Sequence, residues 1–167
     1  ENAAGAMGFS GDDGRTSIFD YCCIPTLVRW YNNGNCGIQK LNNKERKIRA
    51  FYKKVLRLCN GEKAISEGAF FDLMYVNYHN LNPNKQYLYL RHYENETLLI
   101  AVNFDSQDAI VYADIPQHAF DFLKIDSGTY FMKELISGKQ KTVEFSSNAK
   151  FELHIPAHNG VVWKIVK

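Results

Sequence analysis

The chain has 167 residues, of which 46% are hydrophobic and 14% aromatic, so it can bury one substantial core or two small ones and is not a disordered chain. Its 20 basic and 18 acidic residues leave a net charge of +2, which predicts neither nucleic acid nor an anionic membrane as a partner. No apolar run reaches the roughly 18 to 20 residues of a membrane-spanning helix, and the first residues do not resemble a signal peptide.

Residues 1–42 are rich in glycine and asparagine and have weak apolar periodicity. A compact domain rarely contains so long an irregular segment without an architectural or functional reason. Because position 1 is not methionine, we expect the natural polypeptide to begin upstream. Trp30 lies in this segment and is one candidate platform for a sugar ring.

The cysteines form a poor disulfide framework, because there is no CxxC spacing and two of the four are adjacent: Cys22, Cys23, Cys36 and Cys59. We expect free, mostly buried thiols. This slightly favours a cytoplasmic over a periplasmic or secreted location.

An amphipathic helix is predicted from about residue 43 to residue 59. Asn42 and Glu45 have the spacing of a capping box, and Asn60-Gly61 predicts a left-handed stop. The basic residues lie away from the apolar stripe, which indicates a solvated face and not a nucleic-acid contact. The stripe consists of Ile48, Phe51, Tyr52, Val55, Leu58 and Cys59.

After Gly68 the pattern changes to short β segments separated by turn clusters, without intervening helices. Apolar residues alternate along several of them, as in Phe151, Leu153 and Ile155, or Val161, Trp163 and Ile165. This predicts a mainly β fold, an antiparallel Greek-key β-sandwich preceded by one long helix and an irregular glycine-rich segment. The expected strands are 70–78, 86–93, 97–104, 109–115, 129–136, 141–146, 150–155 and 160–166.

Four segments resemble the C-terminal part of bacterial α-amylase superfamily glycoside hydrolases. GFSGDDGRTSIFDY (8–21) resembles the loop after the eighth barrel strand, and residues 46–77 are similar to the final barrel helix and its entry into domain C. LLIAVNF (98–104) and IPAHNGVVWKIV (155–166) resemble the central and closing strands of domain C.

The resemblance implies a remnant of the (β/α)8 barrel at 1–60 and a domain C sandwich at 61–167. The family's enzymes cleave α-1,4-glucosidic bonds with retention, using carboxylates on barrel strands four, five and seven. None of those strands lies in this chain, so we expect no catalytic residue, no cofactor and no metal, and no activity of the chain alone. The implied partner is the parent barrel, with α-glucan as a possible ligand.

The loop after the eighth strand offers Asp12, Asp13 and Arg15 as candidate contacts at the substrate rim. Retaining hydrolysis needs two carboxyl groups roughly 5 to 5.5 Å apart and facing one bond. Adjacent residues of an extended chain point to opposite sides, so Asp12 and Asp13 do not fit that pair. Loop scaffolding is the alternative role.

Tyr87, Tyr89 and Tyr93 alternate onto one face of a predicted strand, opposite Leu88 and Leu90. Three phenol rings could stack against glucose units, which is the basis of an alternative function as a self-standing carbohydrate-binding module. The other interpretation is that these amphipathic side chains cover a half-exposed sheet.

Two further features concern metals and self-association. His154 and His158 have HxxxH spacing, but Pro156 between them excludes the helix that would align their rings. In the absence of a barrel, the helix stripe must be covered by residues 1–42 or by the β domain, or must pair between chains.

Overall fold

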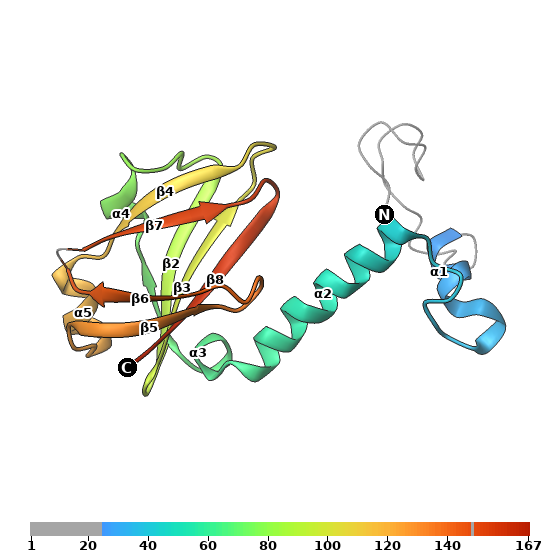
Figure 1. The fold of residues 1–167 in the computed structure, drawn as a ribbon, viewed down its shortest axis with the longest axis horizontal. Coiled ribbons are helices and arrows are strands. Elements are labelled where there is room, and N and C mark those ends of the chain that lie inside the picture. The colour runs from blue at the N-terminus through green and yellow to red at the C-terminus, as the bar shows by residue number, and fades with distance from the viewer. Residues whose placement is uncertain (1–24, 148) are drawn as a thin grey trace. The chain divides into compact units, whose positions relative to one another are not determined.

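The computed structural model describes residues 25–147 and 149–167, and Figure 1 labels their helices and strands. The chain divides between Lys53 and Lys54 into two compact units. The domain boundary expected at residue 60 stays a prediction. The helices are α1 (Pro25–Tyr31), η2 (Asn32–Gly34), α2 (Asn43–Gly61), α3 (Lys63–Ser66), α4 (Met74–Asn77) and α5 (Gln117–Leu123). The strands are β1 (Ala69–Asp72), β2 (Gln86–Tyr93), β3 (Glu96–Asn103), β4 (Ala109–Asp114), β5 (Gly128–Glu134), β6 (Gln140–Phe145), β7 (Lys150–Ile155) and β8 (Asn159–Val166).

The start of α2 follows from local side-chain chemistry. The predicted capping box forms, with the Glu45 N–H donating to Asn42 Oδ1 and the Asn42 N–H donating to Glu45 Oε2, both at 2.9 Å. The predicted stop is wrong: α2 continues through Gly61, which is not left-handed, and the chain turns at the extended residue Glu62. No residue of α2 is buried.

The β strands form two antiparallel sheets, which confirms the predicted sandwich. The larger has the order β1-β2-β3-β8-β5-β6, and the smaller pairs β4 with β7. β3 leads across to the small sheet, and β8 returns from it to lie between β3 and β5, which is a Greek-key type of connection. In Figure 1, β4 and β7 run across the direction of β2, β3 and β8.

The main core lies between the two sheets. The predicted inward faces are confirmed, because the alternating apolar residues of β7 and β8 all belong to this core. The helix α5 adds Ala119, Phe120 and Leu123, and the rings of Phe120 and Phe145 lie 5.1 Å apart. Such dense apolar burial is the main source of stability of the sandwich.

Two helices interrupt the strand pattern, contrary to expectation. The predicted strand 70–78 ends at Asp72, whose Oδ1 accepts the Met74 N–H at 2.8 Å, and α4 follows. Asn77 is fully buried there and joins α4 to β4, accepting the Asp114 N–H at 2.8 Å and donating to the Asp114 carbonyl at 2.9 Å. The helix α5 was not predicted at all, although its buried residues have helical spacing.

Two expectations from the sequence, on membrane-spanning helices and on thiol burial, can be compared with the described residues. The helices within 25–147 and 149–167 are too short or too polar for any of them to cross a membrane. Cys36 is an exposed free thiol and Cys59 is partly buried, so the expectation of mostly buried thiols is wrong for Cys36. Cys22 and Cys23 lie outside the described residues.

Candidate functional site

The face of the six-stranded sheet that is turned away from the main core is called the outer face here. On β2 the predicted alternation is confirmed: Leu88 and Leu90 point into the core, and the tyrosines lie on the outer face. Phe70 of β1 joins them. The ring of Tyr89 lies 5.4 Å from that of Phe70 and 5.6 Å from that of Tyr87, so the three form a continuous aromatic strip across two strands.

Tyr93 does not belong to this aromatic strip. The Lys63 ammonium lies 5.3 Å above its ring, so the cation covers one face of the ring. Burial raises the pKa of Tyr87 and Tyr89, and the neighbouring Glu94 carboxylate raises that of Tyr93. All three phenols therefore remain protonated donors at neutral pH.

Polar contacts fasten α3 to the outer face at both of its ends. Arg91 donates from Nε to the Ala64 carbonyl at 2.8 Å and from Nη2 to the Ile65 carbonyl at 2.7 Å. Glu96 Oε1 accepts the Ala64 N–H at 2.9 Å. These bonds satisfy backbone groups that a four-residue helix cannot pair internally.

Two carboxylates bind the same ammonium group beside α3. Lys164 Nζ lies 2.6 Å from Glu62 Oε2 and 3.1 Å from Glu96 Oε2. Burial alone would lower the pKa of Lys164, but the hydrogen bonds from both carboxylates raise it overall. The ammonium occupies the space between Glu62 and Glu96, so a glycosidic bond cannot lie there, and the pair is unsuited to acid and nucleophile roles.

A groove with a volume of about 530 Å³ opens between the β5–β6 hairpin and strands β7 and β8. Its wall contains Trp163, and the Lys141 ammonium lies 4.8 Å above that ring. Burial lowers the pKa of Lys141. Lys141 thus closes the face on which a sugar would have to stack.

Glu134 also lines this groove and is only 2% exposed. Burial would raise its pKa, but the Ser137 side chain and the backbone N–H groups of Val162, Ile136 and Ser137 donate to the carboxylate, and the net pKa is lowered. A carboxyl group held ionised in this way cannot serve as a general acid. It organises the turn after β5.

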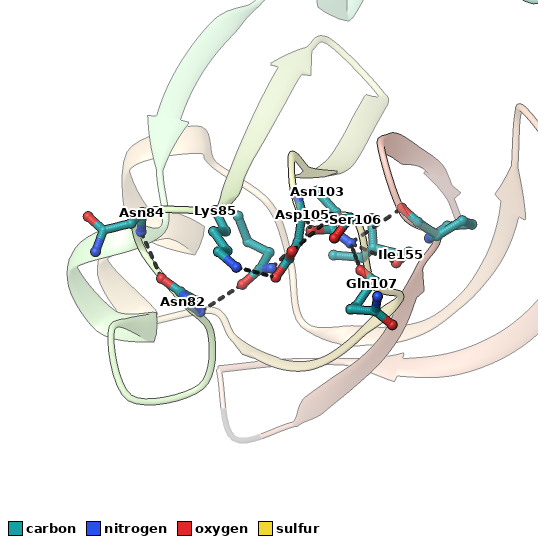
Figure 2. A network of polar contacts seen from close by, with 10 residues as sticks. Asn82, Asn84, Lys85, Asn103, Asp105, Ser106, Gln107 and Ile155 are labelled. Carbon is teal, nitrogen blue, oxygen red and sulfur yellow. Dashed lines mark hydrogen bonds and ion pairs between the residues drawn. The ribbon is translucent and has the colours of Figure 1, made fainter. Parts of the chain in front are cut away.

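A second polar cluster lies at the end of β3 and is shown in Figure 2. The buried Asn103 donates to the carbonyl of Gln107 at 2.8 Å and to that of Ile155 at 3.3 Å. Its Oδ1 accepts from Gln86 Nε2 at 2.9 Å and from the Asp105 N–H at 3.0 Å. The cluster satisfies loop backbone groups, and both the Oδ1 and the Nδ2 of the buried Asn103 are engaged within it.

The remaining predicted site residues are placed as follows. Asp12, Asp13 and Arg15 lie outside the described residues. Trp30 is 37% exposed on α1, where the neighbouring Arg29 binds Glu45 and lowers the pKa of that carboxyl to about 2. His154 pairs with Glu152 at 2.7 Å, and within residues 25–147 and 149–167 no three side chains gather as metal ligands.

Reasoning from the sequence missed two parts of the outer face, Phe70 and the ties to α3. The uninterrupted apolar run from Leu98 to Val102 is a signal that could have indicated a strand buried on both faces. The partners of Arg91 and Lys164 carry no such signal, because they are distant along the chain.

The comparisons with known proteins concern the fold. No model of a known protein family matches the sequence, and no curated protein matches it. Solved structures do match. An α-amylase from Geobacillus thermoleovorans is 16% identical at a TM-score of 0.56, over 93% of this chain and 26% of that one.

Two other solved structures match in the same way. An Anoxybacillus α-amylase is 18% identical at a TM-score of 0.51, over 72% of this chain and 22% of that one. The isomaltulose synthase PalI from Klebsiella sp. LX3 is 18% identical at a TM-score of 0.50, over 97% of this chain and 24% of that one.

The chain therefore has the fold of a part of these enzymes and spans only about a quarter of their length.

Proposed function

We propose that this chain is the C-terminal, non-catalytic part of an α-amylase-type glycoside hydrolase and that it supports the catalytic barrel. The parent enzyme, in this proposal, hydrolyses α-1,4-glucans such as starch, glycogen and maltooligosaccharides. The observation that carries the proposal is that almost the whole chain matches a minor part of an α-amylase.

The surface of α2 supports the same proposal. Large apolar residues of its stripe are exposed to an extent unusual for a soluble helix, with Ile48 at 38%, Phe51 at 40% and Tyr52 at 52%. Leu56, at the edge of this stripe, is 60% exposed. A helix with such a face is stabilised by covering it, and in the parent enzyme the barrel strands do so.

The chemistry of the described carboxylates supports a non-catalytic role. Retaining hydrolysis requires one protonated and one ionised carboxyl group on either side of an accessible sugar. Glu62 and Glu96 are bridged by Lys164, and Glu134 is buried and ionised. Lys164 therefore fills the space between Glu62 and Glu96 that a glycosidic bond would need, and Glu134 is held in the form that cannot act as a general acid.

The test compares the full-length protein with the 167-residue chain. The upstream reading frame should encode about seven further βα units. Release of reducing sugar from starch should occur with the full-length protein and not with the isolated chain. Sugar release by the chain alone, or an upstream frame without a barrel, would contradict the proposal.

The same isolated chain tests the alternative of a self-standing carbohydrate-binding module. Such a module would bind insoluble starch, and Tyr89→Ala would weaken that binding. We expect no retention of the isolated chain on starch.

A further inference from the structure

The groove between the β5–β6 hairpin and strands β7 and β8 has the size of a small-molecule site. Its volume of about 530 Å³ lies within the range of about 300–1,000 Å³ that is typical of pockets for small ligands. Pro156 in its wall is exposed and Ile136 is half-buried, so both offer apolar surface to a ligand. An apolar group that covers them is favoured by the release of water.

The wall formed by the β5–β6 hairpin is held in place by Glu134. Its carboxylate accepts the N–H groups of Ile136 and Val162, both at 3.0 Å, and that of Ser137. These bonds fasten the loop after β5 to β8. The groove is therefore formed before a ligand arrives, which reduces the entropy lost on binding.

The ammonium group of Lys141 faces this groove without a full set of partners. Nζ donates to the Glu152 carbonyl at 3.3 Å and lies 4.8 Å above the Trp163 ring. Within residues 25–147 and 149–167 it forms no ion pair with a carboxylate, although an ammonium group has three N–H donors. The charge of Glu152 raises the pKa of Lys141 less than burial lowers it. An anion beside Nζ would offset this cost of burial.

The other accessible polar groups of the groove are mainly hydrogen-bond donors. Lys139, two positions before Lys141, forms no ion pair in the described part of the chain. Asn159 Oδ1 already accepts the Gly160 N–H at 2.8 Å, so its NH₂ group remains to donate. Gln140 adds a further amide.

The carboxylates in the groove wall already accept hydrogen bonds. Glu134 is held by N–H groups, and Glu152 Oε1 lies 2.7 Å from His154 Nε2. The donors of Lys139 and Lys141 thus outnumber the acceptors that remain, which favours a ligand rich in acceptor oxygens. A neutral sugar matches the groove less well, because each of its hydroxyls also needs an acceptor.

We propose that this groove binds a small organic anion, whose phosphate or carboxylate group pairs with Lys141 and Lys139 and whose apolar body lies against Ile136 and Pro156. The site goes beyond the function proposed above. It is built from the sandwich alone and requires neither a catalytic barrel nor an α-glucan. Failure of one proposal therefore leaves the other standing.

The test uses the fluorescence of Trp163 in the groove wall. In a Trp30→Phe background of the 167-residue chain, Trp163 is the remaining tryptophan. The chain is titrated with phenyl phosphate and with benzoate, which distinguish the two acid groups. Phenol supplies the apolar body without the charge, inorganic phosphate supplies the charge without the body, and maltose represents a neutral sugar.

At least one of the two aromatic acids should bind at least about tenfold more tightly than phenol, inorganic phosphate or maltose, because only it has both parts. Lys141→Met should weaken that binding at least about tenfold, since the chief cationic partner is lost. Lys133→Met is the matched control. Lys133 is exposed on the same hairpin and does not line the groove, so binding should be unchanged.

The half-buried position of Lys141 calls for a second variant in case Lys141→Met lowers the urea midpoint. Lys139→Met changes an exposed side chain and should weaken binding at least about threefold. Absence of binding by both aromatic acids would overturn the proposal, as would equal binding of phenol or maltose. Undiminished binding in both lysine variants would also overturn it.

Discussion

Asn103 illustrates how one buried amide holds together segments that are far apart in the sequence. Its side chain bonds the neighbouring Gln86 on β2, the loop after β3 and the end of β7. Each bond is made in a site that is 1% exposed, where a lost partner leaves another group without water to replace it.

Asn103→Ala should destabilise the sandwich by about 2–3 kcal/mol, because it leaves the Gln86 amide and several backbone groups unpaired. Urea denaturation followed by tryptophan fluorescence measures this in a Trp30→Phe background, where only the buried Trp163 reports. Asn84→Ala is the matched control. Its side chain is exposed and should change the stability by less than about 0.5 kcal/mol. Equal effects of the two substitutions would contradict the role assigned to Asn103.

Glu134 is predicted to make the stability depend on pH. Its folded-state pKa is lowered from the ordinary value of 4.5, so the ionised form is favoured by folding. The stabilisation is fully present above the unfolded-state pKa and is lost as the pH falls through the lower folded-state pKa. Glu134→Gln should therefore be destabilised relative to the parent chain at neutral pH.

The difference in the free energy of unfolding between the parent chain and Glu134→Gln should become smaller below about pH 4.5, because the parent chain loses this contribution there. Urea midpoints from about pH 3 to about pH 7 test the effect. Glu144→Gln, on an exposed side chain, is the control and should change the midpoint little. If the difference in urea midpoint between the parent chain and Glu134→Gln stays constant down to pH 3, Glu134 is not the source of the pH dependence.

At the scale of elements, the connection from α3 to β1 depends on a close approach that only glycine allows. A Cβ at Gly68 would clash with the Ala64 carbonyl and lie 2.6 Å from the His92 carbonyl. Both are backbone atoms, which cannot move without displacing α3 or β2. The tight turn is what lets Arg91 and Glu96 reach the backbone of α3.

Gly68→Ala should destabilise the sandwich by about 2 kcal/mol or more, because the backbone must shift. Gly61→Ala is an informative contrast. A Cβ at Gly61 meets nothing within 4 Å, and because Gly61 is the last residue of α2, the better helix propensity of alanine should add at most about 0.5 kcal/mol of stability. The two variants should thus shift the urea midpoint in opposite directions, and a shift in the same direction would contradict this account.

At the scale of the whole molecule, the apolar surfaces decide how the isolated chain behaves. The stripe of α2 is exposed in the chain alone. Apolar patches of this kind drive association in soluble proteins. We therefore expect the isolated chain to self-associate through α2.

Sedimentation velocity at rising concentration should show this association, and Phe51→Glu should weaken it at least about tenfold by placing a charge within the stripe. Lys53→Glu changes the charge of a neighbouring exposed position outside the stripe and should have little effect. A strictly monomeric chain at high concentration would contradict this prediction.

How much of the fold was predictable depended on how local each signal is. The capping box of Asn42 and Glu45 involves residues three positions apart, so its sequence pattern was sufficient. The prediction of a strand at 70–78 was wrong beyond Asp72. The buried Asn77 forms its hydrogen bonds with Asp114 of β4, a partner that the local sequence pattern does not contain. The helix α5 was missed because it has only seven residues, which is too short for its apolar spacing to stand out among the flanking strands.

The sequence by itself determined the β-sandwich class, the start of α2 and the alternation of Tyr87 and Tyr89 against Leu88 and Leu90. These features follow from periodicity and capping, which act between near neighbours along the chain. Only the tertiary structure decided that Phe70 extends the tyrosines into an aromatic strip and that Lys164 bridges Glu62 and Glu96. Strand register and sheet order bring these residues together, and both are set by burial of the whole core.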